Sequence, residues 1–408
     1  MVCVLQVFVS LSLGFALSPS RKKKLLIVLN YYYPYVSGVS EYARSVAESL
    51  ANTYDVTVLT GKHLPDLPDV ESRDGYTIVR AKPLFFFDKG YISINFLRLF
   101  RKLQKEADIV NLHYPMLESG VLASLTKKPI LMTYQCDMAL VGGVVSRLAV
   151  SLVRWSGRRA IERSARIVTL SSDYAAHSDA LQSAMEKVVQ VYPANRFENA
   201  ANTPANTAVL PCEVQEGKRI VGFVGRFVKE KGIDVLLEAI SRVNDENVVF
   251  WLAGDYEGVA GGSVMDELSA RLKSLGNQVV LLGRLTDDQL IEFYRAIDVL
   301  VLPSVNRFEA FGMVQMEAMT FGSLVVTTNM SGVREVVNRT GFGGLAAPGD
   351  SVSLEKAIRS VLEMRETCSR EKVTRAVLET FNLQEFSSAY KKLIDELSSA
   401  TGVLEYRA

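Results

Sequence analysis

Two glutamates eight positions apart stand out as groups that could do chemistry. Glu309 and Glu317 lie in the segment EAFGMVQME, which follows an apolar run at 299–302. The run predicts a strand, and the residues after Gly312 predict a helix whose free backbone N–H groups would face the carboxyl end of the sheet. Such a helix start binds a diphosphate, and the flanking carboxylates could reach a ribose and a sugar. Alternatively, both are acids favoured near a helix start by its dipole.

Two cations follow another apolar run. Arg226 and Lys231 lie in VGRFVKEKG at 224–232, directly after a strand expected at 220–225. Ligands of open α/β sheets bind at the carboxyl ends of strands, so these cations could neutralise a leaving diphosphate without a metal ion. They could equally be solvated loop cations. Gly38, after the first expected strand, would let a loop approach the same ligand, although turn chemistry also explains a loop glycine.

The elements that must position these residues are apolar runs alternating with helical stretches. This alternation predicts the class α/β with parallel sheets. In the first half, strands are expected at 25–30, 56–60, 109–112, 130–133 and 167–170, with a helix at about 40–52. In the second half, strands are expected at 220–225, 248–253, 279–282, 299–302 and 324–327.

A chain of 408 residues exceeds the usual size of a single core and predicts two domains. A stretch rich in Asn and Ala, with prolines and without a hydrophobic period, separates the two halves and predicts a linker. We expect an extension at 1–24, Rossmann-like domains at 25–195 and 218–380, the linker at 196–217, and a C-terminal helix at 381–408 that packs back on the N-terminal domain.

Composition excludes several classes of protein. Hydrophobic residues at 48% and charged residues at 22% are typical of a globular chain, and a net charge of +1 gives no general attraction to nucleic acid. Four scattered cysteines argue against a zinc site and a disulfide framework, and indicate a reducing, cytoplasmic compartment. The apolar segment 2–17, followed by basic residues at 21–24, fits a non-structural extension or misassigned start, a membrane anchor, or an export signal.

The stretch 146–166 carries six arginines among Leu, Val and Trp155. A basic amphipathic helix with an aromatic residue is typical of binding to an anionic membrane surface, which would place the protein peripherally at the inner face of the membrane. The alternative is a helix packed on the sheet with a solvated cationic edge.

Taken together, these segments resemble the family 4 glycosyltransferases of GT-B fold. The similarity extends over about 25–397 and is carried by SGVSEYARSVAESLANTYDVTVLT at 37–60, VGRFVKEKGIDVLLEAI at 224–240, LAGDYEG at 252–258, LLGRLTDDQL at 281–290 and EAFGMVQMEAMTFGSLVVTT at 309–328. The resemblance implies two Rossmann-like domains with a cleft between them, an N-terminal acceptor domain and a C-terminal nucleotide-sugar domain. It implies retaining transfer of a mannose- or glucose-type hexose from a GDP or UDP sugar to a lipid-linked or polysaccharide acceptor, without a metal or other cofactor.

The resemblance also implies roles for individual residues. Arg226 and Lys231 would hold the donor diphosphate, Glu309 the sugar hydroxyls, and Glu317 the ribose. Further donor contacts would come mainly from main chain, at the phosphates from Gly38, Phe311, Gly312, Met313 and Val314, and at the nucleobase from Gly283, Arg284 and Leu285.

This sequence departs from the family pattern in two places. Ser37 precedes Gly38 where many relatives have a second glycine, and Gln135, in TYQCD, stands where many have a histidine near the reacting sugar. Gln135 could hydrogen-bond a substrate without acting as a base. The nearby His113 is a candidate substitute on the acceptor side, although a strand-end histidine is more often structural. Asp137 is a further acceptor-side candidate.

Other proteins of similar architecture remain as alternatives. A non-catalytic or regulatory sugar-nucleotide-binding protein would be marked by loss of Arg226, Lys231 or Glu309, all of which are present. An epimerase would lack the spacing of the two glutamates, and a phosphorylase would need a longer chain with a lysine for pyridoxal phosphate. A NAD-dependent dehydrogenase would carry G-x-G-x-x-G after the first strand, which this chain lacks.

Overall fold

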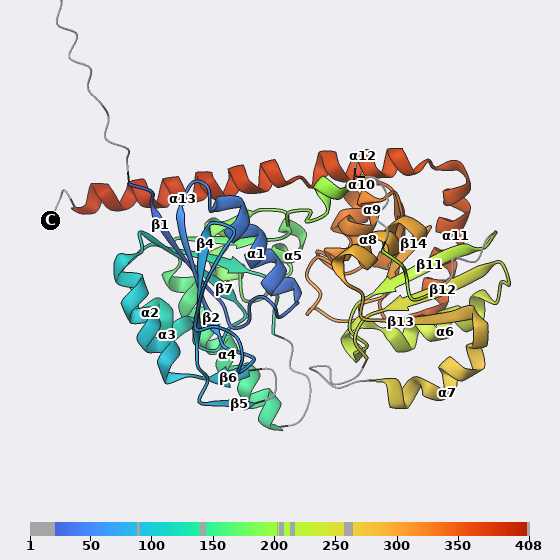
Figure 1. Cartoon of the computed structure of the whole chain (residues 1–408), viewed down its shortest axis with the longest axis horizontal. Coiled ribbons are helices and arrows are strands. Elements are labelled where there is room, and N and C mark those ends of the chain that lie inside the picture. The colour runs from blue at the N-terminus through green and yellow to red at the C-terminus, as the bar shows by residue number, and fades with distance from the viewer. Residues whose placement is uncertain are drawn as a thin grey trace, which may run out of the picture.

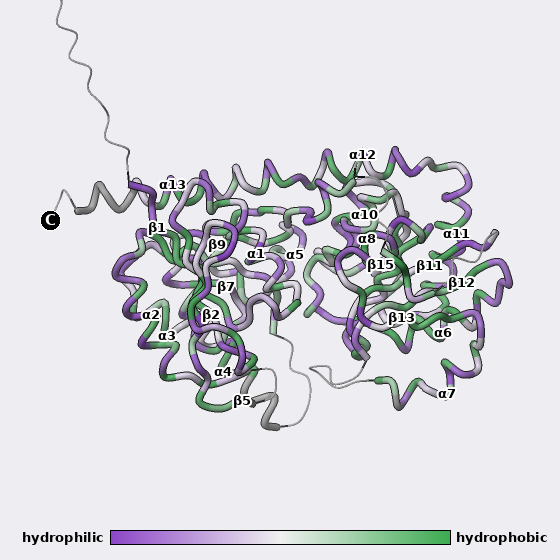
Figure 2. Tube along the Cα trace, viewed as in Figure 1, coloured by the Kyte–Doolittle hydropathy of each residue, from purple (hydrophilic) through white to green (hydrophobic). Residues whose placement is uncertain are grey.

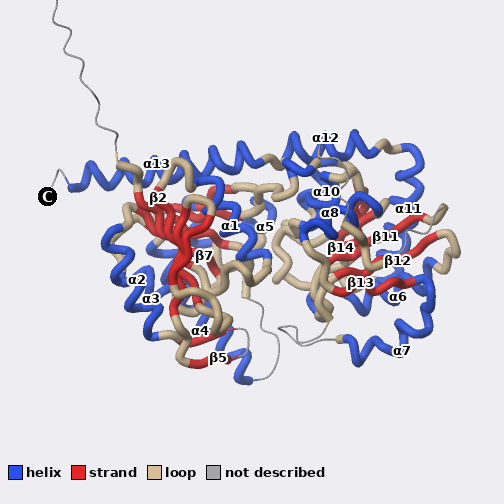
Figure 3. Tube along the Cα trace, viewed as in Figure 1, coloured by secondary structure: helices blue, strands red, loops and turns tan. Residues whose placement is uncertain are grey.

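The protein folds into two α/β domains (Figure 1). The computed structural model describes residues 21–87, 90–138, 144–201, 203, 208–212, 217–256 and 264–405, with main chain only at 86, 87, 90, 144–149, 266 and 400–405. In each domain, strands lie at the centre and helices outside (Figure 3). The predicted α/β class with two Rossmann-like sheets is thus confirmed. Most of the extension expected at 1–24 lies outside the described residues, and Lys24 already belongs to the first strand.

The N-terminal sheet has eight strands in the order β10-β9-β8-β7-β1-β2-β4-β3. All pairs are parallel except β3 with β4. The order reverses direction between β1 and β7, so the loops that leave these neighbouring strands diverge at a topological switch point. The strands are β1 Lys24–Val28, β2 Asp55–Gly61, β3 Val70–Arg73, β4 Tyr76–Ala81, β7 Ile109–Tyr114, β8 Ile130–Tyr134, β9 Arg166–Thr169 and β10 Val188–Gln190, beside a separate hairpin of β5 Phe85–Phe87 and β6 Gly90–Ile92.

The C-terminal sheet has six parallel strands in the order β13-β12-β11-β14-β15-β16. Its switch point lies between β11 and β14, which pair through Val221 and Gly222. The strands are β11 Arg219–Val224, β12 Val248–Ala253, β13 Val279–Gly283, β14 Val299–Leu302, β15 Leu324–Thr328 and β16 Gly343–Ala346. Strands β12, β14 and β15 are buried along their whole length, because helices cover both faces of a parallel sheet. Figure 2 accordingly shows hydrophobic residues along the strands of both domains.

Several of the helices that cover the sheets begin at local capping signals. Ser37 and Ser40 form a capping box at the start of α1, and Thr286 and Gln289 form one at the start of α8. Short 3₁₀ turns lie at Gln182–Lys187, Glu198–Ala200, Lys229–Lys231 and Gly276–Gln278. The α-helices are α1 Gly38–Leu50, α2 Ile94–Glu106, α3 Ser119–Leu125, α4 Val144–Arg163, α5 Ser172–Ala176, α6 Ile233–Val243, α7 Met265–Leu275, α8 Asp287–Ala296, α9 Val314–Thr320, α10 Glu335–Thr340, α11 Ser351–Thr367, α12 Arg370–Thr380 and α13 Leu383–Glu405.

Helix α13 leaves the C-terminal domain and runs along the N-terminal one (Figure 1). The Tyr390 hydroxyl lies 3.1 Å from Thr133 Oγ1 and 3.3 Å from the Tyr42 hydroxyl, and all three groups are buried. Lys23 Nζ adds an ion pair to Asp395 at 2.8 Å. The chain therefore passes between the domains twice, once in the linker after β10 and once between α12 and α13. Within the part of the chain that is described, no helix is long and apolar enough to span a membrane.

Candidate active site

The two loops at the C-terminal switch point are locked together. The loop after β11 ends at Gly232, which has a positive φ of 66° and lies against the carbonyl of Pro303 in the loop after β14. A Cβ at this position would clash with that carbonyl oxygen, so only glycine permits the approach. The backbone N–H of Val305 also donates to the carbonyl of Glu230 at 3.0 Å. Side chains on the two loops are thereby fixed relative to one another.

Lys231 and Glu309 meet at this junction. The Lys231 ammonium forms an ion pair with Glu309 Oε2, to which the Ser304 hydroxyl also donates at 3.3 Å. Their side chains are 22% and 15% exposed, so the pair is partly buried but open to a ligand. Lys231 and Glu309, both predicted to bind the sugar nucleotide, are thus in contact although they lie 78 positions apart in the sequence. Arg226, on the same loop as Lys231, is more exposed and lies 3.4 Å from Glu230 Oε1.

The start of α9 lies in the loop that carries Glu309. Gly312 has a positive φ of 78°, and α9 begins two residues later with no side chain capping its first N–H groups. The Gln315 amide donates to the carbonyls of Phe311 and Val333 at 2.8 and 3.0 Å, which fixes the loop from inside. Because α9 has only seven residues, its dipole is small and the neighbouring cations supply most of the positive charge.

Glu317 is held by side chains that sequence reasoning missed. It is 5% exposed and accepts hydrogen bonds from Arg196 Nε and the Tyr294 hydroxyl, both at 2.8 Å. Arg196 comes from the linker and also pairs with Asp287 at 3.0 Å. Although burial alone would lower the pKa of Arg196, the Glu317 carboxylate raises it well above its usual value. The predicted ribose carboxylate is therefore oriented by the segment that joins the domains.

The third C-terminal segment, suggested for the nucleobase, lies after β13. Gly283 ends that strand and faces open space, since an added Cβ would have no atom within 4 Å. Arg284 is largely exposed and lies 3.8 Å from Asp255, whereas Leu285 packs against the core. The Gly283 carbonyl accepts a hydrogen bond from the Gly254 N–H at 2.8 Å, and a nucleobase contact by this segment stays a prediction.

On the N-terminal side, Gly38 faces the start of α9. It is the first residue of α1, and an added Cβ would lie 3.9 Å from Met313 Cε. The two domains therefore approach each other where the sequence places phosphate-binding groups on both. Further contacts hold this approach, because Arg334 of the C-terminal domain donates to both carboxylate oxygens of Asp173 at 2.6 and 2.8 Å.

His113 does not reach the surface of the N-terminal domain, so its burial gives no support to the acceptor-side role suggested for it. It is 1% exposed, and burial lowers the pKa of its imidazole to about 3, so the ring is neutral at physiological pH. Because the Asn111 amide nitrogen donates elsewhere, Asn111 Oδ1 accepts from His113 Nε2 at 3.0 Å, and Nδ1 accepts from Gln135 Nε2 at 3.0 Å. Its burial supports a structural role for this histidine.

Gln135 and Asp137 lie closer to the domain boundary. Gln135 Nε2 also lies 3.3 Å from the Val39 carbonyl, so the glutamine ties β8 to the start of α1. Asp137 Oδ1 accepts hydrogen bonds from Tyr134 and Ser178, both at 2.6 Å. Both side chains are therefore fixed by the protein itself, and an acceptor contact by either stays a prediction.

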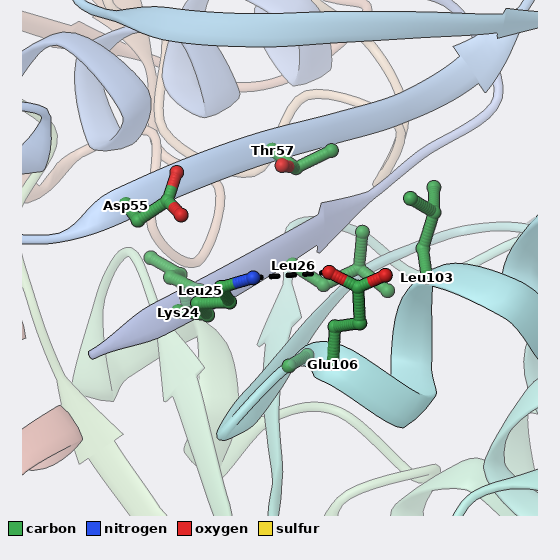
Figure 4. Close-up of a pocket in the computed structure, with 8 residues that line it drawn as sticks. Lys24, Leu25, Leu26, Asp55, Thr57, Leu103 and Glu106 are labelled. Carbon is green, nitrogen blue, oxygen red and sulfur yellow. Dashed lines mark hydrogen bonds and ion pairs between the residues drawn. The ribbon is translucent and has the colours of Figure 1, made fainter. Parts of the chain in front are cut away.

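A separate depression lies at the opposite edge of the N-terminal sheet (Figure 4). It is lined by residues at the amino ends of β1 and β2 and at the end of α2, among them Lys24, Asp55 and Glu106. Lys24 Nζ already pairs with Glu106 at 3.0 Å. Since ligands of such sheets bind at the carboxyl ends of the strands, this depression is distinct from the candidate site.

Comparison with known families covers both domains. Residues 37–194 match the family model described as "Glycosyl transferase 4-like domain", and residues 212–375 match "Glycosyl transferases group 1". The D-rhamnosyltransferase WbpZ of Pseudomonas aeruginosa is 28% identical over 329 residues, 79% of this chain and 82% of its own length. O-antigen chain mannosyltransferase C of Escherichia coli is 25% identical over 331 residues, 79% of this chain and 85% of its own length.

Solved structures share the fold. A sucrose-phosphate synthase from Thermosynechococcus elongatus superposes with a TM-score of 0.74 at 20% identity, covering 93% of this chain and all of its own. Anabaena HepE in complex with UDP and glucose gives a TM-score of 0.68 at 17% identity, over 92% of this chain and all of its own. At such identities the likeness establishes the arrangement of two Rossmann-like domains.

Proposed function

Since the chain belongs to the family 4 glycosyltransferases of GT-B fold, we propose that it transfers a hexose from a nucleotide-diphosphate sugar with retention of anomeric configuration. The observation that carries the proposal is the Lys231–Glu309 pair beside the Gly312 loop, with Gly38 opposite. A diphosphate needs a cation, and the sugar attached to it needs a carboxylate that accepts hydrogen bonds from its hydroxyls. These two groups must lie within a few ångströms of each other. This junction supplies both.

Donor binding exchanges the partners of this pair. Without donor, Lys231 and Glu309 neutralise each other, which limits the cost of keeping two charges partly buried. With donor, the lysine turns to the diphosphate and the carboxylate accepts hydrogen bonds from sugar hydroxyls. Negative charge that develops on the leaving diphosphate is then met by Lys231, Arg226 and the main-chain N–H groups near Gly312. Positioned cations make a metal ion unnecessary.

The anomeric configuration is retained because the acceptor hydroxyl attacks the face of the sugar from which the leaving diphosphate departs. The leaving phosphate accepts the proton of the attacking acceptor hydroxyl, so the reaction requires no protein base at the position of Gln135. A double displacement would instead require a carboxylate on the opposite face of the sugar. Catalysis on this scheme comes from positioning and charge stabilisation.

The donor is a GDP or UDP hexose of mannose or glucose type. Support comes from the relatives, which include a mannosyltransferase, and from HepE, whose structure holds UDP and glucose. A thermal-shift screen of UDP, GDP and ADP sugars tests the assignment, because a ligand that binds only the folded state raises Tm. We expect one nucleotide class to raise Tm and its sugar to be hydrolysed slowly without acceptor. Absence of a shift with every nucleotide sugar would overturn the proposal.

The acceptor is a lipid-linked or polysaccharide glycan, presented at the cytoplasmic face of an anionic membrane. Support comes from α4, on which Trp155 is 63% and Leu152 49% exposed beside the exposed Arg154 and Arg158. Exposed apolar side chains among cations suit an anionic interface. In a flotation assay we expect binding to anionic but not neutral vesicles, with loss in Trp155→Ala. No flotation of the wild type with anionic vesicles at low salt would rule the membrane role out.

A further inference from the structure

One side chain of the linker touches both domains. Arg196 forms ion pairs with three carboxylates, each from a different helix. Its Nε donates to Glu317 Oε1 of α9 at 2.8 Å, and its Nη1 donates to Asp287 Oδ1 of α8 at 3.0 Å. The same Nη1 lies 3.6 Å from Glu41 Oε2 of α1, in the N-terminal domain. One guanidinium therefore contacts the predicted ribose carboxylate and the first turn of α1.

Glu41 depends on nearby cations to stay charged. Its side chain is only 12% exposed, and within the described chain Oε2 has ion-pair partners but no hydrogen bond. Arg44 lies 3.0 Å and Arg196 3.6 Å from that oxygen. Burial raises the pKa of Glu41, the two arginines oppose the rise, and the Glu317 carboxylate adds to it. If Arg196 were removed, Glu41 and Glu317 would lose the cation that both contact and would repel each other.

The contacts of Glu317 leave room for one further hydrogen bond on its outer oxygen. Oε2 accepts from the Tyr294 hydroxyl at 2.8 Å and from Arg196 Nη2 at 3.4 Å. Among the described residues, Oε1 accepts from Arg196 Nε alone. A carboxylate oxygen can accept two hydrogen bonds, so Oε1 keeps one lone pair for a ligand. Because Tyr294 is fully buried, the carboxylate is held from two sides and its orientation is fixed before a nucleotide binds.

Through Glu41, the arginine also contacts the helix that begins at Gly38. Glu41 lies in the first turn of α1, and its backbone N–H donates to the Ser37 carbonyl at 2.9 Å. Gly38, the first residue of that helix, faces Met313 in the loop before α9. The attraction between Arg196 and Glu41 therefore draws the start of α1 toward the loop expected at the donor phosphates.

We propose that Arg196 is a positioning residue for the donor, which orients Glu317 toward the ribose and, through Glu41, holds the start of α1 beside the diphosphate. The inference rests on the proposed function and adds a linker residue to the donor site. A guanidinium suits this task, because its planar fork of N–H groups contacts several carboxylates at once, whereas the ammonium of a lysine is a point charge. Loss of the arginine removes recognition of the ribose, whereas loss of the Glu41 charge leaves that recognition in place.

Isothermal titration calorimetry tests recognition of the ribose. The probes are UDP, GDP and ADP, each compared with its 2′-deoxy and 3′-deoxy forms. For the nucleotide that binds, we expect one deoxy form to bind the wild type about tenfold more weakly, the loss typical of one hydrogen bond to a charged acceptor. Arg196→Met should abolish this ratio, and Arg196→Lys, which keeps the charge but not the fork, should lower it. Glu41→Gln should weaken both forms by the same factor and leave the ratio unchanged.

The controls separate this inference from the donor assignment. Arg219→Met should change neither affinity nor ratio, since Arg219 pairs with Asp245 at the amino end of β11, away from the site. Tm without ligand shows which variants fold, and Arg196→Lys decides the outcome if Arg196→Met does not. A wild-type ratio near one, or an unchanged ratio in a folded Arg196 variant, would overturn the inference. Absence of binding of every nucleotide to the wild type would instead overturn the donor site.

Discussion

The two sheets carry opposite chemistry at the same topological position. At the switch point of the C-terminal sheet, Lys231 forms an ion pair with Glu309, and Arg226 lies on the same loop as Lys231. At the switch point of the N-terminal sheet, the loop after β1 carries Tyr31 and Tyr35, whose ring centroids lie 4.8 Å apart, and His63 lies 5.6 Å from Tyr35. One edge therefore carries mainly charged side chains, and the other mainly aromatic rings. The difference shows that two sheets of the same architecture carry different side chains at the same edge, because the loops supply those side chains.

The sharpest way to break this comparison is to remove the central cation. We expect Lys231→Ala to lower kcat/KM for transfer by about 100- to 1,000-fold, the loss typical of one transition-state contact. Steady-state kinetics measure the loss, and an unchanged Tm without ligand shows that the fold is intact. Lys229→Ala is the matched control, since Lys229 is exposed on the same loop and pairs with Glu267. Near-normal transfer by the Lys231→Ala protein would show that the carboxyl edge of the C-terminal sheet takes no part in the reaction.

A second test concerns the contact between the two C-terminal loops. Gly232→Ala forces a Cβ onto the Pro303 carbonyl at a positive φ, and we expect it to destabilise the fold by roughly 2–4 kcal/mol. Gly341→Ala is the control, because Gly341 has a similar φ of 75° but no atom near an added Cβ. It should cost about 1–2 kcal/mol. Urea unfolding of both proteins gives the difference, and equal losses would show that the loops are not locked together.

The linker arginine tests whether the two edges are coupled. We expect Arg196→Met to cost about 2–3 kcal/mol, below the value for a fully buried pair because Arg196 keeps 17% exposure. Glu317 is then left buried without its cation, so nucleotide affinity should fall as well. Adding Glu317→Gln should recover part of the stability. A double mutant no more stable than Arg196→Met would show that the pair does not explain the loss.

The smallest effect is expected from pH. The folded-state pKa of His113 is about 3, below the roughly 6.5 of an unfolded histidine, so the unfolded state binds the extra proton first. Stability is therefore complete above pH 6.5 and falls as pH drops below it, by about 1 kcal/mol between pH 7 and 5.5. His113→Gln should remove this part of the pH dependence, as measured by urea unfolding at the two values. An NMR titration of His113 near pH 6.5 would show instead that the cleft reaches it.

Part of this arrangement could be predicted from the sequence. Continuous apolar runs such as 248–253 and 299–302 predict buried parallel strands, and glycine and cations directly after them predict a ligand-binding edge. The edge strand β3 escaped prediction because its residues are exposed or half-buried and form no apolar run, and β4, β5, β6, β10 and β16 were not predicted either.

The contacts that orient the site were not predictable from spacing. Arg196 meets Glu317 across 121 positions, and Tyr31 meets Tyr91 across 60. No local pattern connects such residues, because only the tertiary fold brings them together. The contact between Gln135 and His113 was equally unpredictable. The histidine stays neutral because the surrounding edge of the sheet is buried, and burial lowers the pKa of its imidazole.

Because α13 returns to the N-terminal domain, it affects how a chimera of this chain and a relative must be built. Tyr390 shares a buried hydroxyl network with Tyr42 and Thr133, although its helix follows the C-terminal domain in the chain. A chimera spliced once, in the linker, would pair the N-terminal half of one parent with the terminal helix of another. To exchange donor preference between parents, the graft should be cut at two places and leave 383–398 with the recipient.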